Sequence, residues 1–113
     1  MNSFSEVKTF QVKPDKVDEF ENLIKTIVEE QKIQCGCINA KYLKRFYIFD
    51  VIGELPRKLT KIVKCVRYYS FWEFDTIENY TAATNWFFKK YNKQINKCLI
   101  MPFEINCGDT LLY

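Results

Sequence analysis

The segment YYSFWEFD, residues 68–75, constrains the fold of this 113-residue chain more than any other. Tyr, Phe and Trp are typical of β-strands, whereas Asp75 followed three residues later by Glu78 is a variant of the capping box that begins helices. The segment therefore predicts an aromatic strand that passes directly into an amphipathic helix. Both tryptophans, Trp72 and Trp86, fall within this one strand-helix unit.

The rest of the chain contains one further helical pattern and three further strand patterns. Pro14 suits a first helical turn, and apolar residues follow it at three- and four-residue spacing. The second helical pattern is long for one helix, so we expect an interruption at Asn85 or Asn92. In chain order, the prediction is strand 4–12, helix 14–32, strand 38–49, an insert at 50–59, strand 64–74, a helix ending before Pro102, and strand 103–107, which residues 111–113 would extend.

This order predicts one α+β domain over residues 1–113, with the ferredoxin-like split βαβ fold (βαββαβ): an antiparallel sheet with two helices on one face. Successive strand residues point to opposite faces, so Trp72 and Tyr68 face one way and Tyr69 and Phe71 the other. One layer of helices covers only one of these aromatic faces. We therefore expect the other face to pair with an identical subunit, as a homodimer.

Charge and hydropathy exclude several functions. A net charge of +3 gives no case for nucleic-acid binding. No stretch approaches the ~20 apolar residues of a membrane helix, and residues 1–13 lack the apolar segment of a signal peptide. We expect a cytoplasmic protein that does not bind a membrane.

Metal sites are also unexpected, because the chain has no histidine and its five cysteines lack paired zinc-type spacing. We interpret the cysteines as reduced thiols that act as small, mostly buried apolar residues; the alternative is a redox role for Cys35 and Cys37 on a turn. Glu73 and Glu104 would form a carboxylate pair only if their strands were adjacent. The basic run from Arg57 to Arg67 is interpreted as the charged edge of a strand, with phosphate or nucleic-acid binding as the alternative.

Several segments together resemble one family: VKP with VDEF, then QCGCI, then FWEF with NY. They are similar to the antibiotic biosynthesis monooxygenase-like domains, which are dimeric α+β barrels, and the resemblance spans the chain except the insert near residues 50–60. That family includes cofactor-free oxygenases of quinol-like aromatics, haem-degrading enzymes and many members of unknown role. The haem-degrading members use an Asn, a Trp and a His where an ungapped alignment places Val7, Thr81 and Tyr91. We therefore expect no haem and no other cofactor, although a gapped alignment would bring Asn85 and Trp86 closer.

The cofactor-free members offer Asn, Trp, Tyr and Arg side chains to a phenolic substrate. By this resemblance we expect a pocket for a small aromatic molecule, with Trp86 close to Trp72; the alternative is that these rings fill the core. No residue stands out as the base, so the catalytic residues stay unassigned. Two functions remain open: a cofactor-free monooxygenase, and a non-catalytic ligand-binding or structural homodimer. The expected pocket residues are Tyr68, Trp72, Tyr80, Asn85, Trp86 and Tyr91.

Overall fold

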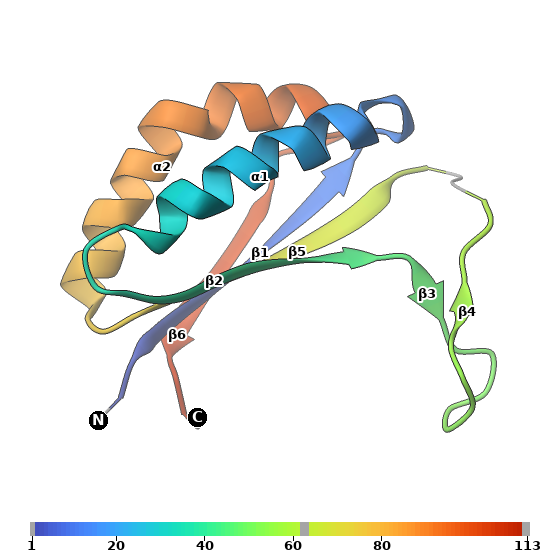
Figure 1. Ribbon diagram of the computed structural model, residues 1–113, viewed down its shortest axis with the longest axis horizontal. Helices are drawn as coiled ribbons and strands as arrows, with labels where there is room; N and C mark the ends of the chain where they lie inside the picture. The colour runs from blue at the N-terminus through green and yellow to red at the C-terminus, as the bar shows by residue number, and fades with distance from the viewer. Residues whose placement is uncertain (1, 62–63, 112–113) are drawn as a thin grey trace.

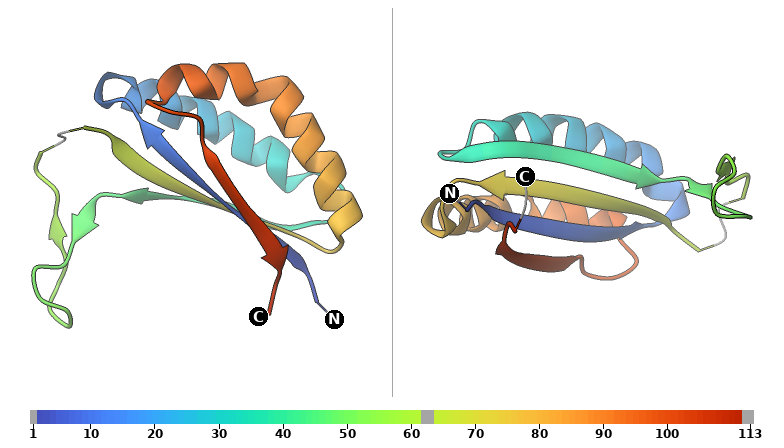
Figure 2. Two further views of the ribbon diagram at one scale, coloured as in Figure 1. Left: turned by 180° about the vertical axis from the view of Figure 1, so that it is seen from behind. Right: turned by 90° about the horizontal axis from the view of Figure 1, so that it is seen from below.

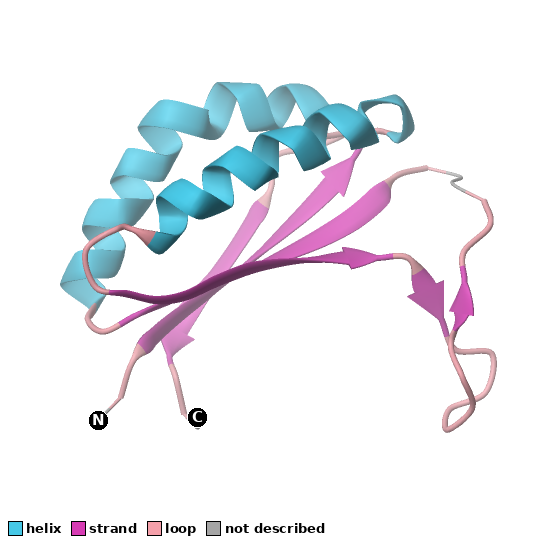
Figure 3. Cartoon of the chain, viewed as in Figure 1, coloured by secondary structure: helices cyan, strands magenta, loops and turns pink. Residues whose placement is uncertain are grey.

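The computed structural model describes residues 2–61 and 64–111. Its four long strands form one antiparallel sheet in the order β2-β5-β1-β6, and both helices lie on the same face of that sheet (Figure 1; Figure 3). The predicted ferredoxin-like arrangement is therefore confirmed. The elements are β1 (Phe4–Val12), α1 (Val17–Lys32), β2 (Cys37–Arg45), β5 (Val66–Phe74), α2 (Ile77–Cys98) and β6 (Glu104–Asp109).

The two helices follow the apolar periodicity of the sequence. A 3-10 turn, Pro14–Lys16, precedes α1, so the predicted helix begins in a tighter form than expected. The α2 helix runs without interruption, which corrects the predicted break at Asn85 or Asn92. Its buried residues recur at three- and four-residue steps along the whole helix, so packing on the sheet offsets the weak helix propensity of both asparagines.

The start of α2 differs from the predicted capping box. The N-cap is Thr76, whose side chain accepts a hydrogen bond from the backbone N–H of Asn79 at 3.1 Å. Asp75 instead accepts from the side chain of Asn79, and its own N–H donates to the carbonyl of Gly36 at 2.9 Å. The turn after α1 and the start of α2 are thereby joined, which fixes both helices at one end of the sheet.

The sheet has one covered face and one open face. The β1–β5 register pairs Glu6 with Trp72 and Phe10 with Tyr68, and all four side chains face the helices. The opposite face carries Val7, which is 39% exposed, and is uncovered in the view from below (Figure 2). Both faces of β5 thus carry aromatic side chains, as predicted.

A hairpin separates β2 from β5 and projects from the side of the sheet opposite the helices (Figure 1; Figure 2). It comprises residues 46–59, here called the arm, in which β3 (Tyr47–Ile48) pairs with β4 (Arg57–Lys58). The predicted strand 38–49 therefore ends early, at Arg45, and the aromatic strand begins at Val66 rather than at residue 64. Part of the basic run, at 62–63, and the end of the predicted extension, at 112–113, lie outside the described residues.

The arm makes the chain less compact than a domain of its size. The radius of gyration is 15.3 Å, against about 13 Å for a compact chain of this length. Within residues 2–61 and 64–111, no helix has the length and apolar character needed to cross a membrane.

Candidate functional site

A buried ion pair lies between the sheet and the helices. Glu6 and Lys8 are two residues apart on β1, so the pleat points both toward the helices, and both are fully buried. The Lys8 ammonium donates to the Glu6 carboxylate, and the Tyr80 hydroxyl donates to the other carboxylate oxygen at 2.7 Å. Removing two charges from water costs several kcal/mol per ion. Such a pair is weak evidence for stability and marks a candidate site.

Aromatic rings surround the cation of this pair. The Lys8 ammonium lies 4.2 Å from the ring centroid of Phe87 and 4.9 Å from that of Trp72, within cation–π range. Burial lowers the pKa of Lys8, although the neighbouring Glu6 acts in the opposite direction. Lys8 therefore releases its proton more readily than a surface lysine.

Two polar atoms beside this pair lack partners. Among the described residues, none forms a hydrogen bond of normal geometry with Ser70 Oγ or Trp72 Nε1, and both atoms are buried. The Tyr42 hydroxyl lies near Ser70, and the Cys37 thiol lies near Trp72. Unpaired buried polar atoms cost about 1–3 kcal/mol each, so they mark places where a water or a ligand atom would be stabilised.

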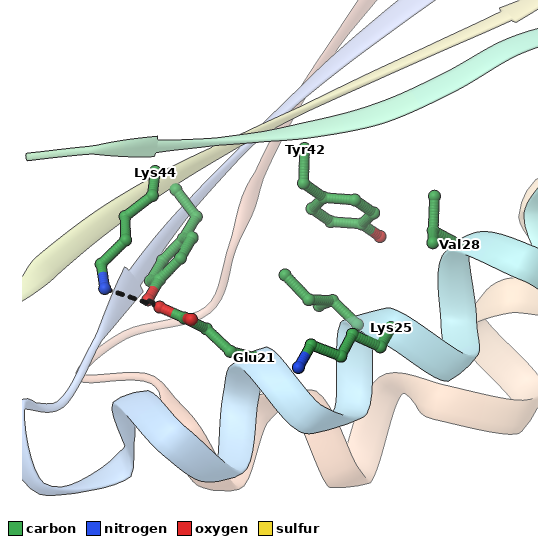
Figure 4. Close-up of a pocket in the computed structure, with 7 residues that line it drawn as sticks. Glu21, Lys25, Val28, Tyr42 and Lys44 are labelled. Carbon is green, nitrogen blue, oxygen red and sulfur yellow. Dashed lines mark hydrogen bonds and ion pairs between the residues drawn. The ribbon is translucent and has the colours of Figure 1, made fainter.

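A groove lies between α1 and β2, on the helix side of the sheet (Figure 4). Its volume is about 270 Å³, close to the lower end of the 300–1,000 Å³ typical of ligand pockets. Its wall is mostly apolar, with the Tyr68 hydroxyl and charged groups at the rim. The lining residues are Glu21, Ile24, Lys25, Val28, Tyr42, Lys44 and Tyr68.

Tyr42 connects the groove to the interior. Its ring lines the groove, and its hydroxyl donates to Gln31 at 2.8 Å, close to Ser70. Burial raises the pKa of Tyr42, so its hydroxyl stays protonated at neutral pH and acts as a donor. In this conformation Tyr42 stands between the groove and the buried pair.

Glu21 is the negative group at the rim. It accepts hydrogen bonds from the Lys44 ammonium at 2.7 Å and from the Tyr68 hydroxyl. Partial burial would raise the pKa of Glu21, but the Lys44 and Tyr68 hydrogen bonds outweigh it and hold the pKa below its usual range. The pKa of Tyr68 is raised, first by burial and then by Glu21. The rim thus combines a carboxylate, an ammonium and a neutral phenol.

The structure divides the predicted pocket residues among three places. Trp72 and Tyr80 border the buried pair, and Tyr68 lines the groove. Tyr91 lies on the inner face of α2 and donates to Glu30 on α1 at 2.5 Å. The other two, Trp86 and Asn85, are half-buried and exposed respectively.

The expected pairing of Trp86 with Trp72 is wrong. The α2 ring that packs on Trp72 is Phe87, at 5.9 Å between centroids, whereas Trp86 packs edge-on against Tyr91, also at 5.9 Å. One residue along a helix turns a side chain by about 100°, which places Trp86 away from the sheet's central strands.

Two of the positions aligned with the haem-degrading enzymes face outward, not into the interior. Val7 is on the open face and Thr81 is exposed, so the ungapped alignment compared two outward positions. A shift of one residue on a strand exchanges its faces, and the inward residues of β1 are Glu6 and Lys8.

No group of three or more Cys, Asp or Glu side chains able to hold a metal occurs within the described part of the chain.

The other two candidate sites are not assembled. Glu73 on β5 pairs with Ser5 and Glu104 on β6 pairs with Thr9, so the strand β1 separates the two carboxylates. All five cysteines are free thiols, but only Cys98 is buried, so the expectation of mostly buried thiols is wrong. Burial raises the pKa of Cys37. A raised pKa leaves less thiolate, which is the opposite of what a reactive thiol needs.

Comparison with known proteins identifies the fold. No protein-family model matches the sequence, and none of the curated proteins matches it. Solved structures do match. A conserved protein from Methanosarcina mazei is 25% identical, with a TM-score of 0.69 over 96% of this chain and 92% of that one.

Two further structures carry the family's description. A candidate antibiotic biosynthesis monooxygenase from Bordetella bronchiseptica is 15% identical, with a TM-score of 0.68 over 99% of this chain and 100% of that one. A variant of SnoaB, a cofactor-independent oxygenase from Streptomyces nogalater, is 12% identical, with a TM-score of 0.68 over 98% and 95% of the two chains. The resemblance to the antibiotic biosynthesis monooxygenase-like domains is thus confirmed as one of fold.

Proposed function

We propose that this chain is a monooxygenase-type protein that binds and oxidises a small phenolic or quinol-like molecule without haem or metal. The observation that carries the proposal is the buried Glu6–Lys8 pair bordered by Trp72 and Phe87. Cofactor-free oxygenation needs a group that takes the phenolic proton and stabilises the resulting anion. The chain has no histidine, and Lys8 supplies an amine of lowered pKa in a dry site.

The chemistry balances without an external reductant. A phenol with a free para carbon plus O₂ gives a para-quinone plus water, so the substrate supplies all the electrons. Lys8 first releases its proton to solvent; its amine then takes the phenolic proton, and the phenolate reduces O₂ to form a carbon–oxygen bond at the para carbon. Loss of the para proton to the distal oxygen breaks the O–O bond and releases hydroxide, which takes the proton from Lys8 to become water.

The groove provides the route to this pair. A flat ring fits against Tyr42 and Tyr68, and it reaches Ser70 and Lys8 when the side chain of Tyr42 turns aside. The SnoaB likeness supports an oxygenase of this type through the shared fold. The five free cysteines fit a reducing compartment, so we also place the protein in the cytoplasm.

Oxygen consumption tests the enzymatic proposal. With phenols of one to three rings that have a free para carbon, the wild-type protein should consume one O₂ per quinone formed, and Lys8→Met should abolish this. Lys93→Met, at an exposed position of α2, is the matched control. The double variant Glu6→Gln/Lys8→Met removes both buried charges. It should therefore stay folded and be inactive, which separates loss of catalysis from loss of folding. Full activity in a folded Lys8 variant, or no turnover of any compound, would contradict the proposal.

The alternative is a non-catalytic ligand-binding or structural homodimer. It is favoured by the packing of Trp72, which is fully buried between Phe74 at 4.9 Å and Phe87 at 5.9 Å. Saturable binding of the same compounds without oxygen consumption would select the binding role, and absence of both would select the structural one.

We further propose a homodimer formed through the open faces of two sheets. Val7 and Leu43 are 39% and 58% exposed on that face, beside the half-buried Tyr69 and Phe71. Apolar side chains grouped on one sheet face are typical of an interface. Light scattering should give twice the chain mass at micromolar concentration; a monomer mass there would contradict this.

A further inference from the structure

The arm has an apolar tip that its own molecule leaves exposed. Ile52 is 83% exposed and Leu55 is 94% exposed, on either side of Gly53 and Glu54. The aromatic and aliphatic side chains of Tyr47, Phe49 and Val51 are also about half exposed. Apolar residues scattered singly on a surface need no explanation, but a group of them at the end of one projection marks an interaction surface.

The arm is an ordered hairpin. Arg57 holds Asp50 through two hydrogen bonds, at 3.0 and 3.2 Å, and the backbone of Leu59 donates to Phe46 at 2.8 Å. The turn at the tip is closed by Glu54 N–H donating to the Val51 carbonyl at 3.2 Å. A preformed projection loses less conformational entropy on docking than a disordered loop would.

The open sheet face has a hollow of about 270 Å³ that could receive such a tip. Its floor is apolar, with Val7 from β1 and Phe71 from β5, and Lys41 adds a positive charge. The tip carries the complementary negative charge, at Glu54. The lining residues are Val7, Lys41, Tyr42, Leu43, Tyr69, Ser70 and Phe71.

The position of the arm identifies the occupant of this hollow. The arm projects on the open side of the sheet, so any molecule that covers this face lies beside the arm (Figure 1). Each chain carries both the tip and the hollow on that same side. A two-fold operation that seats one tip in the partner's hollow also seats the other tip, and it closes the assembly.

We infer that, in a homodimer, the tip of each arm, residues 51–55, inserts Ile52 and Leu55 into the hollow on the open sheet face of a second copy. This inference rests on the proposed sheet-to-sheet homodimer and adds a reciprocal exchange of arms to it. The arm then sets the dimer's affinity and its register, with Glu54 placed against Lys41 of the second copy.

Sedimentation equilibrium of matched variants tests the exchange. Leu55→Asp should weaken dimerisation at least tenfold, whereas Ile33→Asp, at an 80% exposed position at the end of α1, should leave it unchanged. Glu54→Lys and Lys41→Glu should each weaken the dimer, and the two changes combined should restore it. Both side chains at 33 and 55 are exposed, so circular dichroism should show the fold intact.

The possible results of these experiments distinguish the exchange of arms from the sheet-to-sheet dimer itself. A wild-type dimer whose dissociation constant is the same in Leu55→Asp would overturn the arm exchange and leave the sheet-to-sheet dimer standing. A wild-type monomer at 100 µM would overturn both. A photo-crosslinker at position 55 in a mixture of isotopically light and heavy protein should give light–heavy crosslinks to residues 41–43 or 69–71. Crosslinks within one chain only would also overturn the exchange.

Discussion

The Lys8 ammonium lies 4.2 Å from the ring centroid of Phe87, so a cation on the first strand contacts an aromatic ring on the second helix. The same ammonium is paired with Glu6, and both side chains are fully removed from water. A core of this size could be built without charges at these positions. The pair is therefore the feature of the interior that most needs a functional explanation.

Breaking this pair should be costly. Lys8→Met leaves the Glu6 carboxylate buried with Tyr80 as its one side-chain donor among the described residues, and the free energy of unfolding should fall by about 3–5 kcal/mol. Glu6→Gln/Lys8→Met removes both charges and should recover most of that loss. Urea denaturation of the wild type and the two variants measures the difference. A double variant as unstable as Lys8→Met would show that lost packing, rather than the unpaired charge, causes the damage.

Two glycines of left-handed conformation provide a matched comparison of backbone strain and steric contact. A Cβ on Gly36 would lie 2.2 Å from Asp75 Oδ1 and 2.5 Å from Asn79 Nδ2, whereas a Cβ on Gly53 meets nothing within 4 Å. Both have positive φ, at +80° and +101°. Alanine at either site adds about 1–2 kcal/mol of strain, and Gly36→Ala should cost more because the Asp75–Asn79 cap must also move. Equal losses in thermal denaturation would show that the cap adapts freely.

Acid should selectively weaken the contact at the groove rim. The pKa of Glu21 is lower in the folded chain than its ordinary 4.5, because the Lys44 and Tyr68 hydrogen bonds outweigh the effect of burial. Its stabilising effect is therefore complete above about pH 5 and is lost as the pH falls through the lowered folded-state pKa. The stability gap between wild type and Glu21→Gln should narrow from pH 7 to pH 3. Glu29→Gln, at an exposed position of α1, is the control, and a gap independent of pH would contradict the assignment.

The order of the elements could be predicted because it depends on local periodicity. The buried Phe20, Ile24 and Ile27 of α1 recur at helical spacing, and the aromatic strand alternates between two faces. The insert at 50–59 was predicted, but the start of the arm was not, because Tyr47, Ile48 and Phe49 resemble a continuing strand. The strand β2 ends because the chain changes direction after Arg45. No residue type near Arg45 indicates this change.

The buried pair could have been found from the strand's alternation. Phe10 and Val12 have the same parity as Glu6 and Lys8 on β1, whereas Val7 has the opposite parity. If Phe10 and Val12 face the core, the two charges must face it as well. The orientation of Trp86 was harder to predict, because a helix boundary that differs by one residue turns the ring by about 100°.

The two tryptophans should report different events when an aromatic ligand binds. Trp72 lies in the interior beside Lys8, whereas Trp86 packs against Tyr91 on the α1–α2 side. Trp86→Phe leaves Trp72 as the one indole, and quinones entering from the groove should quench it saturably. Trp72→Phe leaves Trp86, which should show only weak, linear quenching by collision. Saturable quenching confined to Trp86 would instead place the ligand near Asn85 and Tyr91, at the pocket expected from the resemblance.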